Sequence, residues 1–137
     1  MRVCELMHKG VISCYADDTV RDVAKNMENN RFRSVVVINE RGEVWGLITY
    51  MEMLPCHDKN LDALKAGDIM RPYRIEVDPQ WSIEDAIRIM KKLRYYHLII
   101  ADPHVGTKWP VGMLTSFDIV KYMAGLKTGH FEQMLKY

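Results

Sequence analysis

Apolar residues recur with the spacing of an α-helix in two stretches of this chain. The first stretch places them at i, i+3, i+4 and i+7, as Val20, Val23, Ala24 and Met27. The second stretch repeats this spacing with Ile83, Ala86, Ile87 and Met90. A helix-capping pattern of a hydroxyl residue and, three positions later, an aspartate opens each stretch: Thr19 with Asp22, and Ser82 with Asp85. We therefore expect two amphipathic helices, each covering a sheet.

Continuous apolar runs predict the strands of that sheet. Residues 34–38 and 97–101 are β-branched or aliphatic almost throughout, which is typical of a strand buried on both faces. Shorter runs at 11–14 and 74–77 precede the two helices, and we expect strands there as well. The remaining segments are predicted from glycines, polar turns and short apolar runs: a hairpin turn at 39–42, a longer one at 102–108, helices at 50–54 and 116–123, a linker at 55–60, and a short helix at 61–66.

The two halves of the chain are copies of one pattern. A shift of 63 residues places Asp22 on Asp85, and after the hairpin a shift of 66 places Gly46 on Gly112. Each copy reads β-α-β-β-α, so the predicted fold class is α+β. A unit this small cannot bury both faces of its sheet, so we expect the copies to pack sheet to sheet as one pseudo-two-fold module. The expected domains are a first repeat with its linker at 1–60, a second repeat at 61–125 and a helical tail at 126–137.

Composition and charge narrow the classes of partner. The 137 residues are 48% hydrophobic and carry a formal net charge of +1, which favours neither nucleic acid nor an anionic membrane. The chain lacks an apolar run that resembles a signal peptide or a membrane span, so we expect a cytoplasmic protein. Three irregularly spaced cysteines are more typical of reduced thiols than of disulfides.

The segment from Gly112 to Asp118 carries the candidate chemistry. With a strand ending at Leu114 and a helix starting after it, Thr115 and Asp118 fall on one helical face. Unpaired N–H groups at a helix N-terminus suit a phosphate, and a carboxylate there suits a diol such as ribose. The alternative is that Thr115 only caps the helix and Asp118 only complements its dipole.

Enzymatic and metal chemistry find little support in the sequence. G-x-S-x-G, a P-loop and a plausible nucleophile–base couple are missing, so we expect no enzyme. The remaining thiols and imidazoles do not have metal-ligand spacing, and we interpret them as structural thiols and surface histidines: Cys4, His8, Cys14, Cys56 and His57.

The ordered set of motifs resembles a tandem pair of cystathionine-beta-synthase (CBS) domains, a Bateman module. The second copy carries it through residues 68–70, 82–86, 94–102 and 112–118, and the first through 5–7, 31–39 and 46–49. The resemblance implies a regulatory module that binds AMP, ADP, ATP or S-adenosylmethionine in the cleft between the copies, as a regulatory ligand and with no required cofactor. It also implies a conformational change passed to an unknown regulated protein, and a homodimer. The alternative is a ligand-free dimerisation or protein-interaction module.

The resemblance also implies roles for residues in this chain. Asp118 would hold the ribose hydroxyls, with Thr115 near ribose or phosphate. The residues implied to enclose the base are Tyr73, Arg74, Ile75, Tyr96 and His97. Arg33 is the candidate for the phosphates. In the first copy Glu52 replaces the aspartate, so we expect a weak or empty second site, formed by Thr49, Glu52, Val11 and Ile12.

Overall fold

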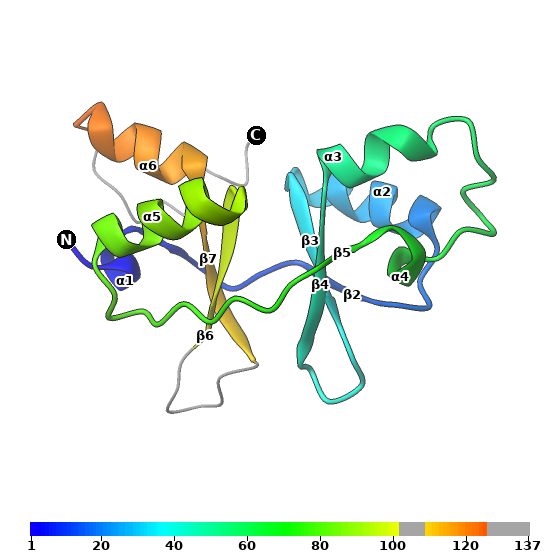
Figure 1. Ribbon diagram of the computed structural model, residues 1–137. Coiled ribbons are helices and arrows are strands. Elements are labelled where there is room, and N and C mark those ends of the chain that lie inside the picture. Colours follow the sequence, from blue (N-terminus) through cyan, green and yellow to red (C-terminus); the bar gives the residue numbers. More distant parts are fainter. Residues whose placement is uncertain (102–108, 126–137) are drawn as a thin grey trace. The chain divides into compact units, whose positions relative to one another are not determined.

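The computed structural model describes residues 1–101 and 109–125, and Figure 1 shows its helices and strands. In chain order the elements are α1 (Val3–Leu6), β1 (His8–Lys9), β2 (Ser13–Tyr15), α2 (Val20–Asn30), β3 (Ser34–Ile38), β4 (Val44–Thr49), α3 (Tyr50–Met53), the 3-10 helix η1 (Leu54–Cys56), α4 (Ala66–Ile69), β5 (Arg71–Pro72), α5 (Ile83–Leu93), β6 (His97–Ala101), β7 (Pro110–Thr115) and α6 (Ser116–Met123). The predicted turn at 102–108 and tail helix lie outside the described residues.

The chain divides into two compact units that do not follow the simple order of the sequence. One unit combines residues 1–11 with 75–125, as far as the described residues extend, and is called the 75–125 unit below. The other is the 12–74 unit. The expected division at residue 60 follows the order of the repeats, whereas the packing joins residues 61–74 to the first repeat and residues 1–11 to the second.

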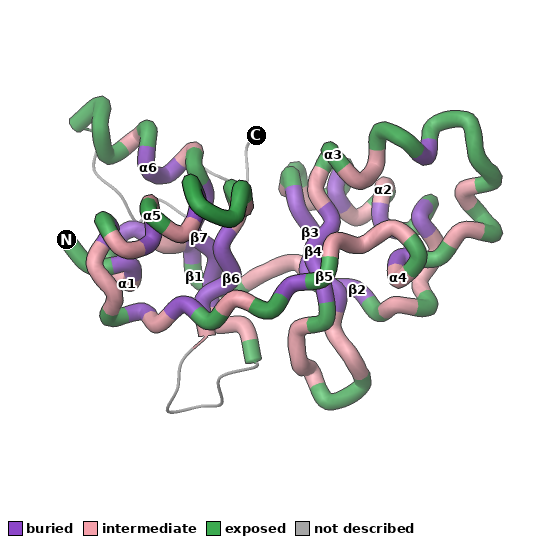
Figure 2. The backbone as a smooth tube through the Cα atoms, in the orientation of Figure 1, coloured by how far each residue is buried: buried purple, intermediate pink, exposed green. Residues whose placement is uncertain are grey.

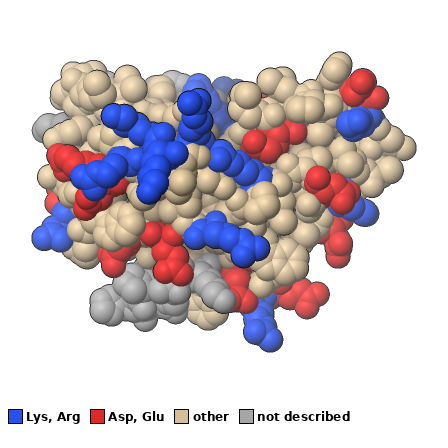
Figure 3. Space-filling view, in the orientation of Figure 1, with Lys and Arg blue, Asp and Glu red and all other residues tan. Residues whose placement is uncertain are grey.

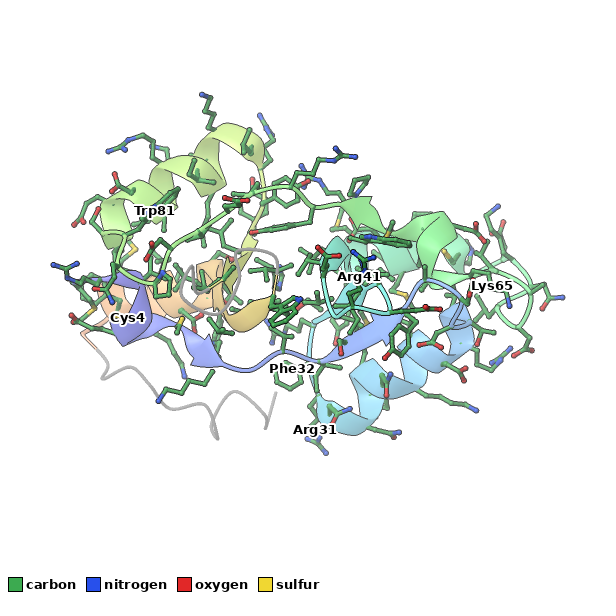
Figure 4. All side chains as sticks on the ribbon, turned by 90° about the horizontal axis from the view of Figure 1, so that it is seen from below. Cys4, Arg31, Phe32, Arg41, Lys65 and Trp81 are labelled. Carbon is green, nitrogen blue, oxygen red and sulfur yellow. The ribbon has the colours of Figure 1, made fainter. Side chains whose placement is uncertain are left out.

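The 75–125 unit contains a three-stranded sheet with the order β1-β7-β6. Helix α5 packs on β6 and helix α6 packs on β7, as Figure 1 shows. The N-terminal residues are fixed to the segment before α5, because the Val3 amide donates to the Trp81 carbonyl at 2.8 Å and the Cys4 amide donates to that of Pro79 at 2.8 Å. Figure 4 labels Cys4 and Trp81 in this unit. The core consists of apolar side chains from these helices and strands: Val3, Leu6, Val77, Ile83, Ala86, Met90, Leu98, Ile100, Leu114 and Ile119.

The 12–74 unit contains a four-stranded sheet with the order β2-β3-β4-β5. Strand β2 runs parallel to β3, and the other neighbours are antiparallel. Figure 2 shows that buried residues follow the strands β3 and β4. The core side chains are Cys14, Val23, Met27, Val35, Val37, Ile48 and Ala66. The mixed α+β class predicted from the repeat is confirmed.

The two main helices begin and end as their sequences predict. Thr19 and Ser82 accept hydrogen bonds from the amides of Asp22 and Asp85, both at 3.1 Å. Each helix ends at an arginine with left-handed backbone, Arg31 (φ 54°) and its repeat equivalent Arg94 (φ 56°). The predicted strands 34–38 and 97–101 are also confirmed as β3 and β6.

Two local predictions were wrong. The run at 74–77 forms no strand and makes one isolated bridge, Val77 to Ile100. The helix expected at 61–66 is a series of turns, and a helical turn follows it as α4. The edge strands β1 and β5 were not predicted, because two residues are too few to show any periodicity. Among the described helices, none is long and apolar enough to cross a membrane.

The edge strands explain the glycine that opens the last strand of each copy. Strand β1 pairs with β7, with Lys9 opposite Gly112, and β5 pairs with β4, with Pro72 opposite Gly46. A Cβ on Gly112 would lie 2.3 Å from the backbone oxygen of His8. A Cβ on Gly46 would lie 2.5 Å from the Met70 sulfur and 3.0 Å from the Arg71 backbone oxygen. Glycine is therefore required where an edge strand approaches this closely.

We expect Gly112→Ala to lower the free energy of unfolding by about 1–3 kcal/mol, as overpacking does in well-packed regions. Gly46→Ala should cost less, because its main obstacle is a flexible methionine side chain rather than backbone. Urea denaturation of both variants, with the parent protein alongside, measures the difference. Equal losses of stability would contradict the proposed role of the β1 backbone.

Candidate functional site

The start of helix α6 holds the two residues that the sequence analysis singled out. The carboxylate oxygen Oδ2 of Asp118 accepts from the Thr115 amide at 2.8 Å and from the Thr115 hydroxyl at 3.0 Å. In return, the Asp118 amide donates to Thr115 Oγ1 at 3.2 Å. Both residues are buried, with exposed fractions of 7% for Thr115 and 3% for Asp118. The reciprocal bonds form a capping box that fixes the orientation of the carboxylate.

The second oxygen of this carboxylate lies against a residue that the sequence analysis did not place in the site. His8 Nε2 lies 2.6 Å from Asp118 Oδ1, and His8 is 6% exposed. The interpretation of His8 as a surface histidine was therefore wrong. Strand β1 places it there, because His8 pairs in register with Met113, five residues before Asp118. The repeat contained a clue to the position of His8. The shift of 63 residues that aligns the two copies places His8 on Arg71, and Arg71 lies on the equivalent edge strand, β5.

Burial of both side chains strengthens this contact and raises the cost of breaking it. Polar groups interact more strongly away from water, because the local dielectric constant is lower. A buried charge that loses its partner is also costly. Asp118 in this structure is therefore held on one side by the helix cap and on the other by His8.

Other predicted site residues of the 75–125 unit lie close to this cap in the sheet. His97 pairs in register with Thr115, and the Tyr96 carbonyl accepts from the Ser116 amide at 2.9 Å. The Tyr96 side chain is 52% exposed, so its ring has an open surface on which a planar group could stack. Ile75 is partly buried against the core of the same unit. The structure thus brings Thr115, Asp118 and the strand end at 96–97 together.

The equivalent cap in the 12–74 unit differs by one methylene. Glu52 Oε1 accepts from the Thr49 amide at 2.6 Å and from the Thr49 hydroxyl at 2.7 Å. The longer side chain therefore folds back to make the same two bonds with one oxygen. Thr49 and Glu52 are both partly exposed, in contrast with Thr115 and Asp118.

The remaining predicted residues are divided between the units. The 12–74 unit contains Ile12, Arg33, Tyr73 and Arg74, whereas Val11 ends the N-terminal segment of the 75–125 unit. Arg33 precedes β3 as Tyr96 precedes β6, and its side chain is exposed. Tyr73 is buried, and its amide donates to the Trp45 carbonyl at 3.2 Å.

A groove of about 780 Å³ in the 12–74 unit lies apart from Thr49 and Glu52. It is formed by the start of the loop before α2 and the β3–β4 hairpin: Tyr15, Ala16, Asp17, Asp18, Ile38, Asn39, Glu40, Arg41, Glu43 and Trp45. Arg41, on the hairpin, is labelled in Figure 4. Four carboxylates face one guanidinium in this lining, so the groove is a poor site for a phosphate.

Thiols and imidazoles do not gather into a metal site in the part of the chain that the structure describes. No group of three His, Cys, Asp or Glu side chains there has the arrangement of metal ligands. Cys14 and Cys56 are buried and Cys4 is partly exposed. Burial, with a smaller contribution from the charge of Asp18, raises the pKa of the Cys14 thiol to about 12.

Comparison with protein families places both halves of the chain in one family. The model of the CBS domain matches residues 3–55 and 66–125. The uncharacterized protein MJ1404 of Methanocaldococcus jannaschii is 28% identical over 143 residues, covering 93% of this chain and 33% of that protein. The chain therefore spans about a third of the length of that relative.

Solved structures share the fold at low sequence identity. The CBS domain pair of protein MJ0100 superposes with a TM-score of 0.81 and 19% identity, covering 91% of this chain and 97% of that one. CBSX2 gives a TM-score of 0.74 at 17% identity, covering 90% and 96%. The CBS domain of a bacterial CNNM/CorC family Mg²⁺ transporter gives 0.78 at 16% identity, covering 92% and 89%. These likenesses show the fold.

We expect the native Cys14 thiol to resist alkylation by iodoacetamide at about pH 9, near the ordinary pKa of a thiol. Cys4, which is partly exposed, should react under the same conditions. The raised pKa of Cys14 makes a contribution to the free energy of unfolding that is fully present below the pKa of the thiol in the unfolded chain. This contribution is lost as the pH rises through about 12. Mass spectrometry of iodoacetamide-treated native and urea-unfolded samples measures the alkylation of each cysteine. Modification of native Cys14 as fast as Cys4 would contradict it.

Proposed function

The chain belongs to the CBS domain family, and we propose that it is a regulatory module that binds an adenosine-containing ligand through Asp118. The single observation that carries this proposal is the buried capping box of α6, which orients a carboxylate at a helix start. A carboxylate held in a fixed orientation is a good acceptor for the two hydroxyls of a ribose, because its own side chain does not have to be ordered on binding.

The ligands bound in the similar solved structures support an adenosine-containing ligand for this chain. The MJ0100 pair was solved in complex with 5′-methylthioadenosine and S-adenosyl-L-methionine, CBSX2 with AMP, and the transporter domain with ATP. These molecules share the adenosine group and differ at the 5′ position. The proposal therefore specifies adenosine and leaves the 5′ group open among AMP, ADP, ATP and S-adenosylmethionine.

Side chains of the 75–125 unit suit the base. The half-exposed ring of Tyr96, with His97 and Ile75, offers aromatic and aliphatic surface for a purine. We keep Tyr73 and Arg74 as further base contacts and Arg33 as the phosphate contact, as the family resemblance implies. Figure 3 shows Lys and Arg side chains gathered over the 75–125 unit with Asp and Glu side chains beside them. The formal net charge of +1 suits a small ligand better than nucleic acid or a membrane surface.

Regulation follows from differential binding. A ligand that binds one conformation of the chain more tightly increases the population of that conformation, and a partner protein that distinguishes the conformations senses the ligand. We propose that the module is not itself an enzyme, acts in the cytoplasm and forms a homodimer.

A ligand-free interaction module is the second candidate, and exposed apolar side chains on α3 and α6, including Met51 and Met123, favour a partner surface.

We expect Asp118→Asn to abolish stabilisation by AMP, ATP and S-adenosylmethionine. Asparagine keeps an oxygen for the Thr115 donors but places an amide donor where the ribose needs an acceptor. For the parent protein, ligand at 100 times its Kd should add about 2.7 kcal/mol to the free energy of unfolding. Thermal unfolding with and without each ligand measures both effects.

The matched control is Asp22→Asn, at the same position of α2, where the aspartate is exposed. This variant should respond to ligand as the parent does. Stabilisation of Asp118→Asn equal to that of the parent would refute the role of Asp118. Turnover of the nucleotide would indicate an enzyme, and absence of binding by the parent would favour the ligand-free module.

We expect Glu52→Asp to strengthen a second binding site, so that the stoichiometry of AMP binding increases. An aspartate there reaches the Thr49 donors in the way that Asp118 reaches those of Thr115. Isothermal titration calorimetry measures the number of sites, and Glu52→Gln, which keeps the length and removes the charge, is the control. An unchanged stoichiometry in Glu52→Asp would show that chain length is not what weakens this site.

A further inference from the structure

We propose that His8 limits the affinity of the Asp118 site, because its imidazole occupies the carboxylate oxygen that a ribose diol requires. This inference rests on the proposed function and assigns to His8 a role in regulating the same site. It makes the N-terminal strand β1, far from Asp118 in sequence, a determinant of ligand binding.

The acceptor positions of the carboxylate carry the argument. An ionised carboxylate has about four lone-pair positions, two on each oxygen. Among the described residues, the Thr115 amide and hydroxyl take both positions on Oδ2, and His8 Nε2 lies at Oδ1 at 2.6 Å. A vicinal diol donates two hydrogen bonds. One further position at Oδ1 does not accommodate both donors, so one of the protein groups must withdraw.

His8 is the group that can withdraw without disturbing helix α6. The Thr115 donors belong to the reciprocal half of the capping box, and their withdrawal from Oδ2 would leave the Thr115 amide, which is buried, without this acceptor. His8 comes from another element and contacts the carboxylate through a side chain with two rotatable bonds. A rotation of the imidazole away from Asp118 would open Oδ1 and would not require any change in α6.

The backbone of His8 cannot withdraw in the same way. Strand β1 pairs with β7 at Met113 and Gly112, and the Gly10 amide donates to the Val111 carbonyl at 2.9 Å. The hydrogen bonds of Val3 and Cys4 fix the chain on the other side of β1. The competition is therefore between the His8 side chain and the ribose, at a position that the strand holds constant.

The consequence is a site whose affinity includes the cost of moving an imidazole. Removing that imidazole should tighten binding of a ligand that has both ribose hydroxyls. A ligand that lacks both ribose hydroxyls does not need Oδ1, so its affinity should not change when the imidazole is removed. This difference separates competition from a purely structural role, which would alter binding of both ligands alike.

The experiment is calorimetric titration of the parent, His8→Ala and His8→Leu with AMP and with 2′,3′-dideoxyadenosine 5′-monophosphate. We expect His8→Ala to bind AMP about tenfold more tightly, because the ribose no longer has to displace the imidazole from Oδ1. Its affinity for the dideoxy compound should equal that of the parent. His8→Leu fills the buried space without a donor and should show the same gain, so the test stands if the alanine variant does not fold.

Lys9→Ala is the matched control, since Lys9 is the exposed neighbour of His8 on β1. It should leave both affinities unchanged. If the parent binds AMP and neither His8 variant binds it more tightly, or if the dideoxy compound gains equally, the inference is overturned while the proposed function stands. If neither AMP, ADP, ATP nor S-adenosylmethionine binds the parent or the His8 variants, both are overturned.

Discussion

The approach of two backbones at Gly112 is the constraint on which the rest of the 75–125 unit depends. The absence of a side chain there lets β1 pair with β7, and a Cβ would meet the backbone oxygen of His8 at 2.3 Å. That pairing joins residues 1–11 to the second repeat and places His8 against Asp118. The same relation recurs at Gly46 and β5. The glycine of the repeated motif therefore has a packing cause that is separate from ligand binding.

The capping box serves both stability and the proposed site. Thr115 and Asp118 satisfy donors that a helix start would otherwise leave unpaired, and this arrangement holds the carboxylate before any ligand arrives. The capping interpretation and the ribose-binding interpretation are thus compatible. In the 12–74 unit the same cap is made by Glu52, and the added methylene changes how the carboxylate is presented.

Much of the fold was predictable because it follows from periodicity that occurs twice. The helices α2 and α5 and the strands β3 and β6 each have a clear apolar pattern and a capping or turn signal. Thr115 and Asp118 were predictable as neighbours because they are one helical turn apart. His8 was not, since its contact with Asp118 depends on a two-residue edge strand whose partner is far along the chain. The packing of residues 1–11 with the second repeat was not predicted for the same reason.

The most direct test of the account is a crystal structure of the full chain with bound AMP. The account predicts that both ribose hydroxyls lie within hydrogen-bonding distance of Asp118, that the Thr115 cap is intact, and that the His8 imidazole has rotated away from Oδ1. AMP bound elsewhere, with the His8–Asp118 contact unchanged, would contradict it.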